Sequence, residues 1–202
     1  MAQIIKQQQK EWLSPMKQSE QEMAKWLAHP MEFGEPPIEI SEVYQELTPW
    51  PLFDEKVNLS FHRYKMKNGA SSVGMTGPIT WSFLRDDLNG FSFEDLKRLY
   101  AGWHISFMAV NSSGYSREEN KKRQQSTETK LQQSVNGFEK IVEYLSFGEL
   151  VFYAYKYKRE GKNFVVATDG EDKLEYEEGS KYLRLPPLYY FLGSLFFEGK
   201  LS

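Results

Sequence analysis

Residues 69–78, GASSVGMTGP, decide between a phosphate-binding loop and a β-hairpin, because the stretch matches the phosphate-loop motif at all but one of its defined positions. Its first two glycines have the G-x-x-x-x-G spacing, and Thr76 stands where that loop has Ser or Thr. Met75, however, occupies the position of the lysine that reaches the phosphates. The preceding VNLSFHRYKMK alternates between polar and apolar residues, whereas a phosphate loop follows a continuously apolar strand. The stretch therefore predicts a β-hairpin with its turn at Asn68-Gly69, two residues that tolerate positive φ.

Alternating patterns extend this hairpin in both directions. They predict strands at 57–66, 71–76 and 79–84, and the later WHISFMAV, residues 103–110, predicts one more. Between them, Ser92 and Asp95 approximate a capping box, so we expect a helix that opens at Ser92.

The segment 116–146 predicts one long helix. Ser116 and Glu119 form a capping box, the first half is almost wholly polar, and the second half carries an apolar stripe. We therefore expect the helix to be anchored at its C-terminal half. Lys121-Lys122-Arg123 raises the alternative of contact with a phosphate backbone, but so short a run between acidic residues is typical of a solvated face.

The last section, residues 149–202, predicts a second set of hairpins and a terminal helix. LVFYAYKYK and NFVVAT flank a short turn, and Asp169-Gly170 leads into the acidic EDKLEYEE, which is typical of an exposed edge strand. Pro186-Pro187 then precedes LYYFLGSLFFEGK, a helix that is apolar nearly all round. Such a helix must be buried in this protein or in a partner.

The N-terminal section is less regular. Residues 1–30 predict a pair of short helices, and residues 31–56 form a connecting segment that four prolines interrupt. A short helix over 42–47 is one interpretation of this segment, and we favour a loop that its aromatic residues hold against the core.

Composition sets limits on function. The chain has 202 residues, no cysteine and a net charge of −3, which exclude a disulfide framework and give no general attraction to nucleic acid or anionic lipid. No apolar run reaches the roughly 20 residues of a membrane-spanning helix, and the first residues lack the apolar core of a secretory signal. We expect a cytoplasmic protein without a metal or other cofactor.

These patterns predict a single α+β domain. It would contain an antiparallel sheet built from hairpins, the N-terminal helical pair, one long central helix and a C-terminal apolar helix. Its sections are 1–30, 31–56, the first sheet section at 57–110, the helix at 116–146, and 149–202.

Polar residues suggest one candidate ligand-binding face. If the predicted strands are neighbours, their outward positions place two imidazoles and several hydroxyls on one side of the sheet, where a histidine could act as acid or base. The alternative is the solvated face that antiparallel sheets commonly have. The candidate residues are Ser60, His62, Thr80, Ser82, His104 and Ser106.

Three functions follow, and the sequence favours the first. It is a non-enzymatic protein-binding module of the inhibitor, immunity or adaptor type, which acts through an aromatic-rich surface on another protein or on a second copy of itself. The second is a small-molecule-binding protein or enzyme that uses the face with His62 and His104, and the third is nucleic-acid binding through the polar helix. The candidate partner-binding residues lie in the terminal helix: Tyr190, Phe191, Phe196 and Phe197.

Overall fold

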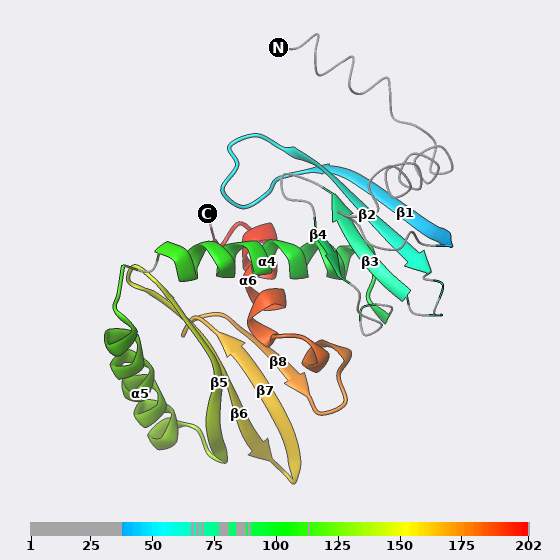
Figure 1. The fold of residues 1–202 in the computed structure, drawn as a ribbon. Coiled ribbons are helices and arrows are strands. Elements are labelled where there is room, and N and C mark those ends of the chain that lie inside the picture. The colour runs from blue at the N-terminus through cyan, green and yellow to red at the C-terminus, as the bar shows by residue number, and fades with distance from the viewer. Residues whose placement is uncertain are drawn as a thin grey trace. The chain divides into compact units, whose positions relative to one another are not determined.

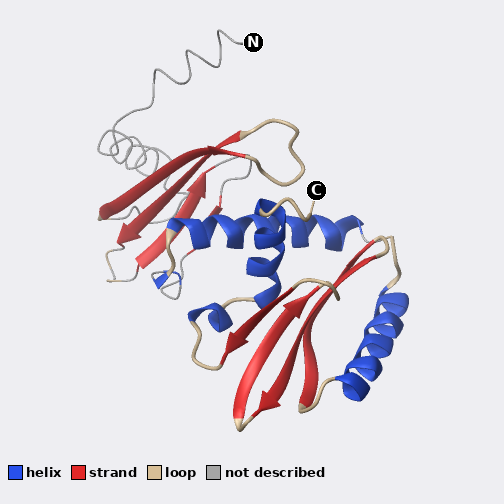
Figure 2. Cartoon of the chain, turned by 180° about the vertical axis from the view of Figure 1, so that it is seen from behind, coloured by secondary structure: helices blue, strands red, loops and turns tan. Residues whose placement is uncertain are grey.

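The fold is known from a computed structural model, which describes residues 38–65, 67, 69, 71–76, 81–83, 88, 90–112 and 114–201 (Figure 1). The predicted helical pair at 1–30 lies outside the described residues. The described chain combines helices with two four-stranded antiparallel sheets, so the α+β class and the antiparallel hairpins are confirmed (Figure 2). The chain groups into two compact units, and Trp50–Leu52 belong to the second unit although residues on both sides belong to the first. The single-domain organisation stays a prediction, since compact grouping does not show whether the units fold independently.

The first unit is a meander of four strands. They are β1 (Glu39–Thr48), β2 (Val57–Lys65), β3 (Ser71–Thr76) and β4 (Trp81–Phe83), each paired antiparallel with the next. The hairpin between β2 and β3 is thus confirmed, and Gly69 in its connection has a φ of 82°. Gly69 lies between two antiparallel strands and Gly74 lies within β3, so no helix begins at the second glycine, as a phosphate loop would require.

Strand β1 corrects the prediction of a loop, and of a short helix over 42–47, in the connecting segment. It pairs with β2 from Glu39↔Lys65 to Thr48↔Val57. A bulge between Ile40 and Glu42 shifts its side-chain alternation by one residue, which hides the strand pattern in the sequence. The segment's prolines precede and follow the strand, so they do not interrupt its ladder.

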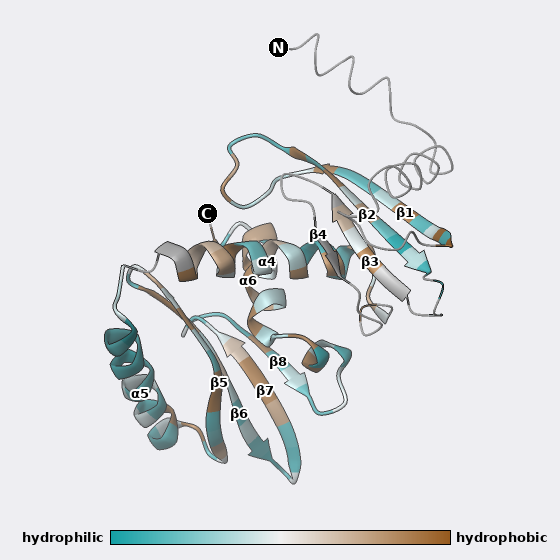
Figure 3. Cartoon of the chain, viewed as in Figure 1, coloured by the Kyte–Doolittle hydropathy of each residue, from teal (hydrophilic) through white to brown (hydrophobic). Residues whose placement is uncertain are grey.

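The second unit packs helices on one sheet. Its helices are α4 (Phe93–Ser112), α5 (Arg117–Ser134), the 3₁₀ turn η2 (Lys181–Arg184) and α6 (Pro187–Phe197). Its sheet runs in the order β5 (Phe138–Phe147), β6 (Leu150–Arg159), β7 (Lys162–Thr168) and β8 (Lys173–Glu177), so the predicted hairpins and the acidic edge strand are confirmed. The helices differ in hydropathy. Helix α5 is largely hydrophilic (Figure 3), whereas α6 contributes apolar side chains to the core.

The strand predicted at 103–110 is wrong, because these residues form the second half of α4. The predicted capping box does open this helix: the Asp95 backbone N–H donates to Ser92 Oγ at 3.1 Å, and the Ser92 N–H donates to Asp95 Oδ2 at 3.2 Å. No stop signal follows, and Ile105 and Ala109, one helical turn apart, both pack in the core. The apparent alternation arose from apolar residues on more than one face of the helix.

The single helix predicted over 116–146 is also wrong beyond residue 134. Its capping box at Ser116 and Glu119 is confirmed, but α5 ends at Ser134 and the chain continues as β5. Gly137 has a φ of 75°, and a Cβ there would lie 2.1 Å from the Lys158 carbonyl oxygen, so this turn requires glycine.

Two bulges explain why β5 has a helix-like pattern. Its register with β6 shifts between Phe138 and Lys140 and again between Ile141 and Glu143. Each bulge adds a residue to one strand, so apolar side chains recur three or four residues apart instead of two. Spacing of that kind is the signature of a helix when only the sequence is read.

The terminal helix α6 is confirmed and lies across α4. The two backbones approach so closely that a Cβ at Gly102 would lie 1.7 Å from the Tyr189 carbonyl oxygen, and one at Gly193 would lie 1.9 Å from that of Arg98. Most of the apolar side chains of α6 are buried against β5–β7 and α4, including Leu188, Phe191, Leu192 and Leu195. Burial within this chain, one of the two alternatives for α6, therefore accounts for most of its apolar surface.

Candidate functional site

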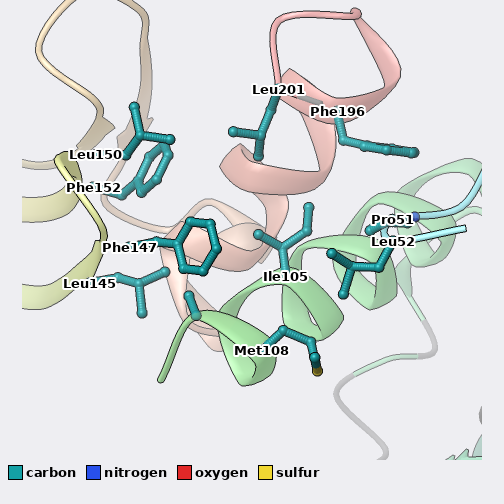
Figure 4. A pocket seen from close by; sticks show the side chains of 11 residues that line it. Pro51, Leu52, Ile105, Met108, Leu145, Phe147, Leu150, Phe152, Phe196 and Leu201 are labelled. Carbon is teal, nitrogen blue, oxygen red and sulfur yellow. The ribbon is translucent and has the colours of Figure 1, made fainter. Parts of the chain in front are cut away.

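The second unit contains a small apolar pocket (Figure 4). Its volume is about 100 Å³. The side chains around it come from α4, from the ends of β5 and β6, from the C-terminal end of α6 and the residues after it, and from the segment after Trp50. Every lining residue is apolar: Pro51, Leu52, Ile105, Met108, Ala109, Leu145, Phe147, Leu150, Phe152, Phe196 and Leu201. We call this site the apolar pocket.

The β5–β6 hairpin forms one side of the apolar pocket. Leu145 and Phe152 are directly opposite each other and buried, so they form part of its floor. The next pair on the same face, Phe147 and Leu150, flanks the turn and is 45% and 51% exposed. The apolar face of the hairpin therefore extends past the buried core, and its last pair, Phe147 and Leu150, is exposed to solvent at the rim of the pocket.

Leu52 forms another part of the rim and combines an exposed side chain with a positive φ. It is 65% exposed and has a φ of 69°, a left-handed conformation that costs a residue with a Cβ free energy. An apolar side chain that is both exposed and held in a strained backbone is more typical of a binding site than of a neutral surface.

Trp50 and His104 hold this rim segment in place. The indole of Trp50 is buried, and its Nε1–H donates to His104 Nδ1 at 3.1 Å. Burial lowers the pKa of His104, so the ring stays neutral near pH 7 and accepts this hydrogen bond. His104 therefore positions Pro51 and Leu52 beside α4.

The predicted ligand-binding residues do not form one sheet face. His104 and Ser106 lie on helix α4 in the second unit, whereas Ser60 and His62 lie on strand β2 in the first. The two histidines are only 5% and 2% exposed, so the alternative of a solvated face is wrong for both. Thr80 lies outside the described residues.

The first unit does bring part of that set together. Ser60 Oγ lies 2.8 Å from His62 Nε2, and the His62 ring stacks on Tyr64 with centroids 5.9 Å apart. The strand register places His62 opposite Gly74, and Gly74 opposite Ser82, so these positions share one cross-strand row. His62 is buried beside the hydroxyl of Ser60 and the ring of Tyr64, which fits a structural role for this histidine.

The predicted partner-binding residues of α6 have four different surroundings. Phe191 is buried in the core, Phe196 lines the apolar pocket, and Lys97 Nζ lies 5.0 Å from the centre of the Phe197 ring. The Tyr190 hydroxyl donates to Asp95 Oδ1 at 3.2 Å. Of the four, Phe196 is the one that contributes to the apolar pocket.

Asp95 connects α4 to the C-terminal section. Its carboxylate accepts hydrogen bonds from Lys181 Nζ at 2.8 Å and from the Tyr182 hydroxyl at 2.9 Å. Burial alone would raise the pKa of Asp95, but these bonds and those from Ser92 outweigh it and lower the pKa below its usual range. This network fixes η2 and α6, and thereby supports the Phe196 side of the pocket.

A polar groove lies beside the apolar pocket, between the end of α4, the first turns of α5 and β5. It encloses about 700 Å³, and Leu145 lines both it and the apolar pocket. Its lining residues are Val110, Arg117, Glu118, Asn120, Lys121, Gln124, Tyr144, Leu145 and Ser146. We call it the polar groove.

The sequence did not reveal the apolar pocket, although it held one usable signal. Large apolar residues flank the Gly148-Glu149 turn on both sides, at Phe147 and Leu150, where turns usually have polar neighbours. Nothing in the sequence connects that turn to Leu52, because the tertiary fold alone brings them around one cavity.

No known protein family, curated protein or solved structure matches this chain. Among the residues that the structure describes, no group of three or more His, Asp or Glu side chains could hold a metal ion, and no helix is long and apolar enough to cross a membrane.

Proposed function

We propose that this protein is a non-enzymatic protein-binding module and that the apolar pocket is its docking site. The observation that carries the proposal is the exposed rim of Leu52, Phe147 and Leu150 around a preformed apolar cavity. Each of these side chains leaves apolar surface in water at a cost of about 25 cal/mol per Å². A partner side chain that fills the cavity and covers the rim removes that cost, as at the buried centre of protein interfaces.

The size of the cavity favours a protein partner over a small-molecule ligand. Drug-sized ligands and cofactors occupy pockets of roughly 300–1,000 Å³ that contain a few convergent polar groups. The apolar pocket measures about 100 Å³ and has no polar lining residue. It suits one apolar anchor side chain of a protein. The alternative site on one sheet face loses its basis because His104 lies on helix α4 and not on a strand.

Selection of peptides tests this function. Random 12-residue peptides displayed on phage are selected on the immobilised full chain, and the enriched peptides are synthesised with a fluorescent label. We expect each enriched peptide to contain a large apolar residue whose replacement by alanine abolishes binding in fluorescence polarisation. Failure to enrich any peptide would contradict the proposal.

A matched pair of surface variants locates the site. Leu150→Asp introduces a charge at the rim and should weaken binding at least tenfold, because a buried unpaired carboxylate costs several kcal/mol. Ile38→Asp is the control, since Ile38 is 58% exposed and does not line the pocket. Equal loss of affinity in the two variants, with unchanged circular dichroism, would show that the pocket is not the docking site.

A further inference from the structure

The polar groove is continuous with the proposed docking site. Leu145 lines both cavities, and the next two residues of β5 divide between them, with Ser146 in the groove and Phe147 at the rim of the pocket. Arg123 of α5 also connects them, because its Nη1 donates to the Gly148 carbonyl at 3.4 Å in the turn that follows Phe147. A linear segment anchored in the pocket can therefore continue along the groove.

Hydrogen-bond donors are in excess along the polar groove. Asn120 and Ser146 satisfy each other, since the Ser146 hydroxyl donates to Asn120 Oδ1. Arg117 and Lys121 form no ion pair or hydrogen bond with any side chain in the described part of the protein, and the same holds for the Tyr144 hydroxyl. Glu118 is the carboxylate of the lining, so two cations face one anion there.

The groove also lies at the positive end of a helix. Arg117 is the first residue of α5, an 18-residue helix whose macrodipole favours negative charge near its N-terminus. Ser116 and Glu119 already cap this end, so the dipole adds to the attraction of Arg117 and Lys121 without offering a separate site.

From this complementarity we infer that the partner segment carries Asp or Glu side chains next to its apolar anchor. The inference rests on the proposed function, because the anchor in the apolar pocket brings the acidic residues to the polar groove. Carboxylates would accept hydrogen bonds from Arg117, Lys121 and Tyr144, which are donors at the groove. The apolar contact supplies most of the affinity, and the charges supply register and partner choice.

Paired peptides test the inference. The peptides selected on the chain should be enriched in Asp and Glu near the apolar residue. A version in which those residues are replaced by Asn and Gln should bind about fivefold more weakly, as two solvent-exposed ion pairs imply. The difference should shrink as the salt concentration rises from 50 mM to 1 M, because salt screens exposed charges.

Variants of α5 locate the effect on the protein. Arg117→Glu and Lys121→Glu should each weaken the acidic peptide about twofold to fivefold and leave the Asn/Gln version unchanged. Lys130→Glu makes the same change of charge on α5 at an exposed position that does not line the groove, and it should have no effect.

The outcomes separate this inference from the proposed function. Selected peptides that depend on Leu150 but show no acidic enrichment, or that bind equally after the Asn/Gln replacement, overturn the inference and leave the docking site intact. Failure to select any peptide overturns both. Binding that depends on Arg117 and Lys121 but not on Leu150 overturns the apolar pocket as the anchor site, and with it the inference.

Discussion

Helices α5 and α6 belong to the same unit but differ in how much of each helix is buried. The 18 residues of α5 include one buried residue, Leu131. The 11 residues of α6 include six: Leu188, Phe191, Leu192, Gly193, Ser194 and Leu195. The first helix therefore presents polar side chains to solvent and to the groove, while the second forms the core that supports the pocket.

The two helices also begin for different reasons. Ser116 and Glu119, three residues apart, cap α5 with their own side chains. At α6 the Leu188 N–H donates to Glu143 Oε2 at 2.9 Å, so a residue of β5 takes the place of a local cap. Burial raises the pKa of Glu143, against the opposing effect of that hydrogen bond. Local sequence specifies α5, whereas tertiary contacts specify α6, and the variants below test this difference.

The largest effect is expected at the crossing of α6 with α4. Gly193→Ala places a Cβ 1.9 Å from the Arg98 carbonyl oxygen, so the two backbones must separate. We expect a loss of about 3 kcal/mol in the free energy of unfolding, the upper part of the range for overpacking. Urea unfolding followed by circular dichroism measures it. Gly90→Ala is the control, because a Cβ at Gly90 meets no atom within 4 Å, and an equal loss there would contradict the role of the crossing.

An intermediate effect is expected at Asp95, which attaches the C-terminal section to α4. Asp95→Asn removes the charge that Lys181 and Tyr182 contact, and we expect a loss of about 2 kcal/mol at pH 7. The folded-state pKa of Asp95 is lowered, so its contribution is complete above the unfolded value near 3.8 and is lost as the pH falls through the lower folded value.

The pH dependence provides the sharper measurement. The stability difference between the wild type and Asp95→Asn should be constant from pH 7 to about 5 and should shrink at lower pH. Asp172→Asn is the matched control, since the ion pair of Asp172 with Lys200 is exposed and worth at most about 1 kcal/mol. A difference that stays constant down to pH 2 would show that the charge of Asp95 is not responsible.

The smallest effect is expected at the start of α5. Ser116→Ala removes the hydroxyl that accepts the Glu119 N–H, which should cost about 1 kcal/mol. Because α5 buries so little, we expect faster amide hydrogen exchange in residues 117–130 and little change in the protection of α6. Ser134→Ala, at the other end of α5, should leave the exchange of residues 117–123 unchanged. Equal loss of protection in α5 and α6 would mean that α5 is as tightly coupled to the core as α6.

Features that depend on adjacent residues could be predicted from the sequence. The capping boxes at Ser92 and Ser116 and the hairpins of β2–β3 and β6–β7 follow from backbone preferences that act over a few residues. Pro187 marks the start of α6 in the sequence, while tertiary contacts supply its capping contact and its burial. The α+β class with antiparallel sheets followed from these elements. The errors at β1 and β5 arose where bulges shifted the alternation of a strand, and the error at 103–110 arose where a helix was apolar on more than one face.

The candidate site itself was decided by tertiary structure. Local residue patterns specify where turns and capped helices begin, because glycine, proline and capping side chains act on their own neighbours. The partners of His104 and Glu143, and the gathering of Leu52, Phe147 and Phe196 around one cavity, depend on contacts between residues far apart in the chain. Only the packing of α4 and α6 on the sheet brings those residues together. The hydrophobic effect is non-directional and stabilises any arrangement that buries the core, so no short-range sequence pattern indicates which arrangement forms.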